Sequence, residues 1–245
     1  MNAHIRHRVT TLALAAATLA TMGVGLAAAG PATAATSVTS RPGCTPATVA
    51  TAQQALEAAL QSRVTELASL TTDVQNATGL TATDRATVSG TLSTTSSGIQ
   101  SLVGEAPSAA TCLAVWQEAK SMVQNYRVFA VVAPQTHLDI AADTADGIET
   151  TLAGQEPNIQ SAITASGKDG VNTTAAQASF ADLQSQVTAA QGLTSGVPAT
   201  VLAQTPASYP GSSPVFVSAR NALRSGFADL KQADADLQAI VADLK

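Results

Sequence analysis

Apolar residues recur at alternating spacings of three and four along most of this chain, the period that places them on one face of an α-helix. The first run begins after Thr45-Pro46, an N-cap residue followed by proline at the first helical position. Its inward positions, two of them polar, are Val49, Gln53, Leu56, Leu60, Arg63, Leu67, Leu70 and Val74. The second run is Val88, Leu92, Thr95, Ile99 and Leu102. This spacing is typical of helices that pack lengthwise along a heptad seam.

Three later runs repeat the pattern. The third helix has a stripe that Leu113, Trp116 and Val123 widen, and its members are Ala119, Met122, Tyr126 and Phe129. A later helix has the inward positions Phe180, Leu183, Val187, Ala190 and Leu193. The last helix has the longest seam, Phe216, Arg220, Leu223, Phe227, Leu230, Asp234, Leu237, Val241 and Leu244. A polar member of such a seam fixes the register with a specific partner, which lies within the chain or on another molecule.

Together these runs predict an all-α protein. We expect helices at about 46–78, 82–103, 109–133, 135–165, 173–194 and 215–244, with Ser108 available to cap the third. Short loops make consecutive helices antiparallel neighbours. The predicted architecture over residues 45–245 is therefore an elongated antiparallel helical bundle with coiled-coil-like seams and about five to six helices.

Pro134 lies inside a strongly helical region. Its ring removes a backbone donor and clashes with the carbonyl group of Ala130, and it disfavours helical geometry at Ala133. The apolar stripe changes phase at this point. Two interpretations remain open, one long helix kinked near Pro134 or two helices joined by a tight bend, and we favour the kink.

Residues 1–34 have the three parts of an export signal. Arg6 and Arg8 form a basic segment, residues 9–30 form an uncharged Ala- and Leu-rich run, and Ala32-Thr33-Ala34 is a small-x-small cleavage site. We therefore expect a secreted protein, located in the cell envelope or the medium. Because the run is long enough to span a bilayer, retention of the signal as a membrane anchor is the alternative. Residues 35–44 are rich in Ser, Thr, Pro and Gly and are expected to be a disordered lead-in.

Composition narrows the classes of partner. The full chain has 12 basic and 17 acidic residues, and loss of Arg6 and Arg8 with the signal leaves 10 basic residues and a net charge of −7. Only 3% of the residues are aromatic, so the chain lacks the basic and aromatic surface that nucleic acid requires. An acidic protein is also unsuited to an anionic membrane surface, and no stable membrane anchor is expected once the signal is removed.

Two cysteines, Cys44 and Cys112, permit one intramolecular pairing. Cys44 precedes the first helix and Cys112 opens the third, so an up-down-up arrangement brings both to the same end of the bundle. Because exported proteins fold in an oxidising compartment, we expect a disulfide bond, with two free buried thiols as the alternative. A bridge that closes this loop of 68 residues contributes about 4 kcal/mol by loop entropy.

One segment resembles a known group of proteins. It contains Tyr126-Arg127-Val128-Phe129, then Pro134, then Ala141-Ala142-Asp143. A Tyr-Arg-Val-aromatic run before a proline and an Ala-Ala-Asp is similar to a segment in uncharacterised, exported, all-helical proteins of high-GC Gram-positive bacteria. The resemblance implies a helical fold and export, and it implies no reaction.

The same segment is the candidate ligand-binding site. Its candidate residues are Tyr126, Arg127, Phe129 and His137. In this interpretation a polar pocket forms at the bend, where His137, Gln135 or a water molecule satisfies the carbonyl group of Ala130. The alternative, which we favour, is that these side chains are structural and hold the bend.

An acidic stripe follows on one helix face, formed by Asp139, Asp143, Asp146 and Glu149. We interpret it as a solvated face, with a pairing of Arg127 to Asp139 or Asp143, a cation site or a contact with a basic partner as alternatives. Carboxylates on one straight helix enclose a cation poorly, because Ca²⁺ requires six to eight converging oxygens. After loss of the signal His137 is the one remaining histidine, which excludes a two-histidine site within a single chain. No metal site or cofactor is predicted.

Catalytic motifs are also missing from the sequence. It has no nucleophile elbow and no Gly-rich phosphate loop, and His137 is the one candidate acid or base. We therefore expect a non-enzymatic, secreted structural or interaction protein that binds itself or an envelope component. The alternative is a small-ligand-binding bundle with a pocket near the Pro134 bend.

Overall fold

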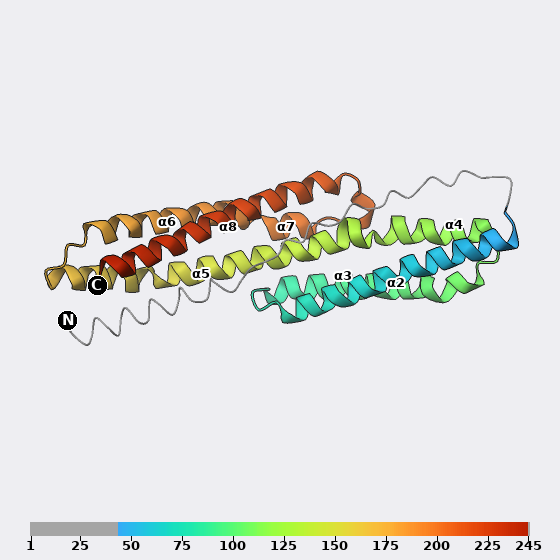
Figure 1. Cartoon of the computed structure of the whole chain (residues 1–245), viewed down its shortest axis with the longest axis horizontal. Coiled ribbons are helices and arrows are strands. Elements are labelled where there is room, and N and C mark those ends of the chain that lie inside the picture. Colours follow the sequence, from blue (N-terminus) through green and yellow to red (C-terminus); the bar gives the residue numbers. More distant parts are fainter. Residues whose placement is uncertain (1–43, 245) are drawn as a thin grey trace. The chain divides into compact units, whose positions relative to one another are not determined.

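The computed structural model describes residues 44–244. The predicted export signal and all of the predicted lead-in except Cys44 lie outside the described residues. Within them the chain is helical and has no strand, which confirms the all-α class. Five helices of 21 to 36 residues dominate (Figure 1): α2 Pro46–Asn76, α3 Ala82–Glu105, α5 Ala133–Lys168, α6 Thr174–Thr194 and α8 Ser212–Asp243.

Shorter helical segments connect these five helices. They are the α-helices α4 Cys112–Ser121 and α7 Val197–Leu202, the 3₁₀ turns η1 Ala106–Ser108 and η4 Pro206–Ser208, and the π-helical segments η2 Met122–Tyr126 and η3 Val128–Val132. Three predicted ranges agree with α2, α3 and α6 to within two residues, whereas the last helix begins three residues earlier than predicted, at Ser212. No helix in the range 44–244 has both the length and the apolar character that crossing a bilayer demands.

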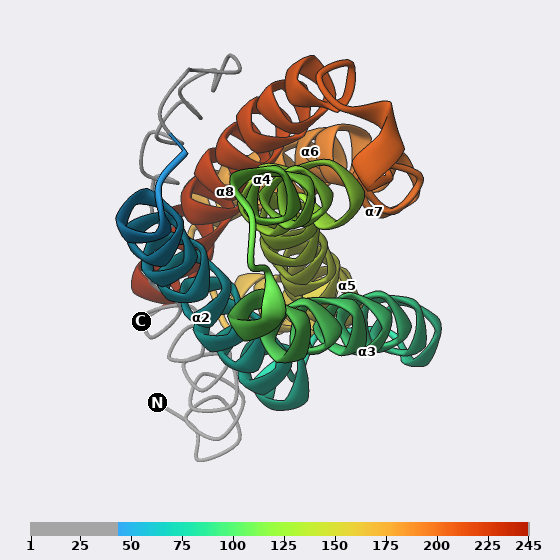
Figure 2. The same ribbon diagram turned by 90° about the vertical axis from the view of Figure 1, so that its right-hand side faces the viewer.

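The described chain divides into two compact units. We name them the N-terminal unit, residues 44–140 and 199–217, and the C-terminal unit, residues 141–198 and 218–244. In the N-terminal unit α2, α3 and the segment from α4 to η3 surround one apolar core (Figure 2). In the C-terminal unit a second core is built from α5, α6 and α8.

The predicted apolar seams are confirmed in α2 and α3. All six apolar members of the α2 seam are buried, and the α3 seam is buried in full, including Thr95. In α6 the prediction fails at its last position, because Leu193 is exposed and Thr194 is buried instead. Steps of three and four from Ala190 both stay on the inward face, so periodicity alone does not choose between the two residues.

Threonine side chains begin the helices of the N-terminal unit. Thr45 caps α2 as predicted, and its hydroxyl accepts a hydrogen bond from the backbone N–H of Thr48. Thr111 caps α4 in the same way, whereas the predicted cap Ser108 lies in the turn η1. Each cap contributes about 1 kcal/mol, because it satisfies a backbone donor that the first turn leaves unpaired.

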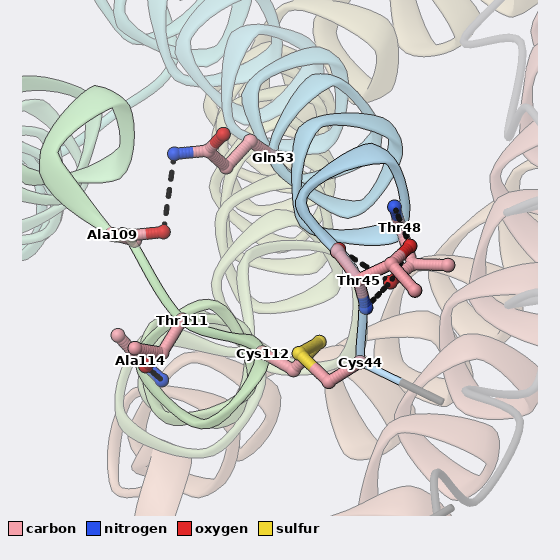
Figure 3. The surroundings of a disulfide bond; sticks show 8 residues. All are labelled: Cys44, Thr45, Thr48, Gln53, Ala109, Thr111, Cys112 and Ala114. Atoms are coloured by element: carbon pink, nitrogen blue, oxygen red, sulfur yellow. Dashed lines mark hydrogen bonds between the residues drawn. A yellow bond between two sulfur atoms is a disulfide. The ribbon is translucent and has the colours of Figure 1, made fainter. Parts of the chain in front are cut away.

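The two cysteines form the predicted disulfide bond (Figure 3). Cys44 immediately precedes the cap of α2 and Cys112 is the first residue of α4, and their Cα atoms lie 6.2 Å apart. Beside the bridge, the Gln53 side-chain amide of α2 donates to the carbonyl group of Ala109 at 3.1 Å. The starts of α2 and α4 are therefore joined by a covalent bond, and a hydrogen bond ties α2 to the loop that precedes α4.

The interruption predicted at Pro134 lies seven residues earlier, at Arg127. Arg127 has φ 41° and ψ 45°, the left-handed conformation, and it separates the π-helical segments η2 and η3. Pro134 is the second residue of α5, where the backbone is already helical again. The wider π turn explains why a helix accepts proline at this position. The N–H of Ala133 bonds to the carbonyl of Val128, five residues back, and the backbone near the proline ring is therefore shifted.

Candidate functional site

The four candidate residues of the bend all lie in the N-terminal unit, and we describe each by its contact. Tyr126 packs against α3 at Gly98, so closely that a Cβ atom added to Gly98 would lie 2.2 Å from Tyr126 Cε1. His137 is exposed, and its Nε2 lies 3.8 Å from Asp73 Oδ2 of α2. An exposed pair at that distance contributes little to stability.

Phe129 and Arg127 each contact a different element. The guanidinium carbon of Arg63, in α2, lies 5.2 Å from the centroid of the Phe129 ring. The guanidinium carbon of Arg127 lies 4.4 Å from the ring centroid of Tyr209, in the loop that follows η4. The four candidates therefore contact four different partners.

Arg127 has the most unusual backbone conformation of the four candidate residues. A left-handed backbone costs a non-glycine residue about 1–2 kcal/mol. Part of that cost is offset because the Arg127 carbonyl accepts hydrogen bonds from the N–H groups of Ala130 and Val131, at 3.1 and 2.8 Å. Its guanidinium stacks on the ring of Tyr209. Its Nε is buried and has no hydrogen-bond partner within the described part of the chain.

Gln135 has a role that the sequence did not indicate. Its buried side-chain amide donates to the carbonyl groups of Val201, Leu202 and Gln204, at 3.0, 3.1 and 3.1 Å. These carbonyls lie at the end of α7, where a helix lacks internal donors. Gln135 therefore does not bond to the carbonyl of Ala130, and this part of the prediction was wrong.

The acidic stripe of α5 is not a solvated face. Asp139 is fully buried, Asp143 and Glu149 are 4% and 1% exposed, and only Asp146 is exposed. The prediction assumed that α5 packs with a single face. Burial of charged carboxylates without compensation is costly, so each buried member requires a local explanation.

Glu149 is the buried member whose surroundings are best defined. Its carboxyl Oε1 lies 2.8 Å from the hydroxyl oxygen of Thr194, the last residue of α6. Burial raises the pKa of Glu149, and the charge of Asp146 acts in the same direction, while the hydrogen bond with Thr194 opposes them. Sequence reasoning missed this pair because Leu193 was assigned to the core in place of Thr194.

One exposed surface of the N-terminal unit was predicted to be packed. Leu113 is 62% exposed and Trp116 is 41% exposed, one turn apart on α4, and Lys120 Nζ lies 5.2 Å from the centroid of the Trp116 ring. We name these three residues the α4 surface. Phe129, predicted on the same stripe, is 39% exposed, whereas Met122 is buried as expected.

Comparison of the chain with protein-family models, curated proteins and solved structures finds no match. The function is therefore argued from the residues and their geometry.

Proposed function

We propose that this chain is an exported, non-enzymatic helical protein that acts by binding a protein partner, and that the α4 surface is the docking position. The export signal predicted from the sequence and the resemblance to exported helical proteins favour this compartment. The Cys44–Cys112 bridge is compatible with it, because disulfides persist in oxidising surroundings.

The exposure of Leu113 and Trp116 carries the proposal. Burying an apolar side chain of this size is worth about 1.5–3 kcal/mol, so the exposed pair leaves that free energy available to a partner. Tryptophan is among the residues most often found at the energetic centre of protein interfaces. An exposed Trp beside an exposed Leu is therefore a better docking candidate than either residue alone.

The α4 surface is also held in position before a partner arrives. The disulfide at Cys112 and the cap at Thr111 both fix the first turn of α4, and Lys120 covers one side of the Trp116 ring. A surface that is ordered beforehand loses less conformational entropy on binding. Its chemistry fits an apolar groove on the partner with a carboxylate close to Lys120.

Site-specific photocrosslinking in the producing cells tests this proposal. A photoreactive residue at position 113 or 116 should give one discrete adduct, and the same residue at Val217, which is 49% exposed on another helix of the same unit, should not. Trp116→Ala should weaken the purified complex at least tenfold, as expected for an interface centre. Identical adduct patterns at 113 and 217, or unchanged affinity of Trp116→Ala, would rule out this surface.

Arg127 supports a second candidate function, the binding of a small carboxylate. Its guanidinium has one aromatic contact and an unpaired Nε, and arginine binds carboxylates through two parallel hydrogen bonds. Strained backbone is also concentrated at functional sites. In a thermal-shift assay citrate should stabilise the protein and should fail to stabilise Arg127→Lys, which keeps the charge and loses the planar fork. Equal shifts in the two proteins would exclude this function.

A further inference from the structure

The contact between Glu149 and Thr194 in the C-terminal unit has an unusual arrangement of acceptors. The Thr194 hydroxyl oxygen lies 2.8 Å from Glu149 Oε1 and 3.0 Å from the carbonyl oxygen of Ala190, one turn back in α6. Both side chains are 1% exposed. Within the described residues Thr194 is the one hydrogen-bond partner of the Glu149 carboxyl group.

Counting protons distinguishes the two ionisation states of Glu149. A hydroxyl group has one proton to donate. With an ionised carboxylate, both neighbours of the Thr194 hydroxyl are acceptors, and one of the two short oxygen–oxygen contacts has no proton. With a protonated carboxyl group, Glu149 donates to Thr194 and Thr194 donates to Ala190, so each contact holds one proton. The neutral form is the one that satisfies both contacts.

The electrostatic surroundings also favour the neutral form of Glu149. Thr194 is the last residue of α6, where the helix dipole places partial negative charge beside the carboxyl group. Asp146, one turn earlier on α5, adds a negative charge. Residues 183–194 of α6 contain no ionisable side chain.

Helix α8 packs against the same threonine. A Cβ atom added to Gly226 of α8 would lie 2.6 Å from Thr194 Cγ2. Within two turns of Gly226 this helix carries Arg220, Arg224, Asp229 and Lys231, and none of them forms an ion pair or a hydrogen bond with Glu149. No cation therefore compensates an ionised Glu149 from this side.

We propose that Glu149 in the folded protein keeps its proton to a higher pH than an ordinary glutamate and donates it to Thr194, so that a proton-dependent clasp holds the end of α6 against α5 and weakens as the pH rises. The raised pKa of Glu149 sets the direction of the effect. The folded state binds the proton more tightly than the unfolded state, so the contribution of the clasp is complete in acid. It is lost as the pH rises from the ordinary glutamate pKa of 4.5 through the higher folded value.

The variant Glu149→Gln tests the clasp, because its amide donates to Thr194 at every pH. The unfolding equilibrium constant of the wild type, divided by that of Glu149→Gln, should rise by up to tenfold per pH unit above pH 4.5 and then level off. Glu156→Gln is the matched control, since Glu156 lies on the same helix and accepts from the Gln184 amide at 2.7 Å. Its ratio reports the pH dependence that replacing another glutamate of this helix produces, and the rise for Glu149→Gln should exceed it.

A second measurement serves if Glu149→Gln does not fold. In wild-type protein with ¹³C-labelled glutamate, NMR titration should show that the assigned side-chain carboxyl carbon of Glu149 ionises at a higher pH than that of an ordinary glutamate. The assignment is needed because burial and the charge of Glu105 also raise the pKa of Glu118. A constant equilibrium ratio for Glu149→Gln, or a Glu149 carboxyl group that ionises in the ordinary range, would overturn the proposal.

Discussion

Gly98 in α3 offers a sharp test of how the N-terminal unit is packed. A Cβ atom at this position would lie 2.2 Å from Tyr126 Cε1 and 2.4 Å from its Cζ and Oη. Real atoms do not approach so closely, so in Gly98→Ala the tyrosine ring must move. Overpacking of this kind costs about 1–3 kcal/mol. Replacing a helical glycine with alanine contributes up to about 1 kcal/mol in the opposite direction.

Gly90 supplies the matched control in the same helix. It is exposed, and an added Cβ would meet no atom within 4 Å, so Gly90→Ala should stabilise the protein by about 0.5–1 kcal/mol. Because the gain in helix propensity is common to both variants, the difference between their unfolding free energies isolates the clash. We expect Gly98→Ala to be less stable than Gly90→Ala by about 1–3 kcal/mol.

Urea unfolding followed by circular dichroism measures this difference directly. In a Tyr126→Ala background the clash is removed, so Gly98→Ala should then stabilise the protein as Gly90→Ala does. Equal stability of the two glycine variants in the wild-type background would refute the close packing of Tyr126 on α3.

Three further predictions concern other contacts. Reducing the disulfide should lower the free energy of unfolding by about 4 kcal/mol, measured by urea denaturation with and without reductant, and unchanged stability would contradict this. Gly226→Ala should destabilise the wild-type protein by about 1–3 kcal/mol. In a Thr194→Ser background, which lacks the clashing methyl group but keeps the hydroxyl, the loss should be smaller by at least about 1 kcal/mol, and equal losses in the two backgrounds would contradict the clash. Gln135→Leu should lower the stability measured by thermal unfolding by about 1–3 kcal/mol, because carbonyl groups at the end of α7 lose their donor. The control Gln100→Leu, at an exposed position, should change stability by less than about 0.5 kcal/mol, and equal losses would count against Gln135 as the donor to α7.

The features that the sequence predicted correctly depend on local spacing. The seams of α2 and α3 follow from a helical period that fixes which residues share a face. The Cys44–Cys112 bridge follows from chain reversal at two short loops, which brings the start of the third helical segment back to the start of the first. Both arguments need only the order of the elements.

The features that could not be predicted from the sequence depend on contacts between residues far apart in the chain. The left-handed conformation of Arg127 accompanies stacking on Tyr209, which is 82 positions further along the chain. Burial of Glu149 and Thr194 requires α5, α6 and α8 to meet, and Gly226 permits that approach. The exposure of Trp116 was missed because an apolar stripe shows which residues share a face, and it does not show that a neighbour covers that face.

Mass analysis of the protein recovered from the growth medium tests the central claim most directly. An exported chain that acts outside the cell should begin at Ala35 and should be two hydrogen masses lighter than its fully reduced form, with Cys44 and Cys112 recovered in one linked peptide. A chain found only inside the cell with residues 1–34 intact, and with both thiols open to alkylation, would contradict the account.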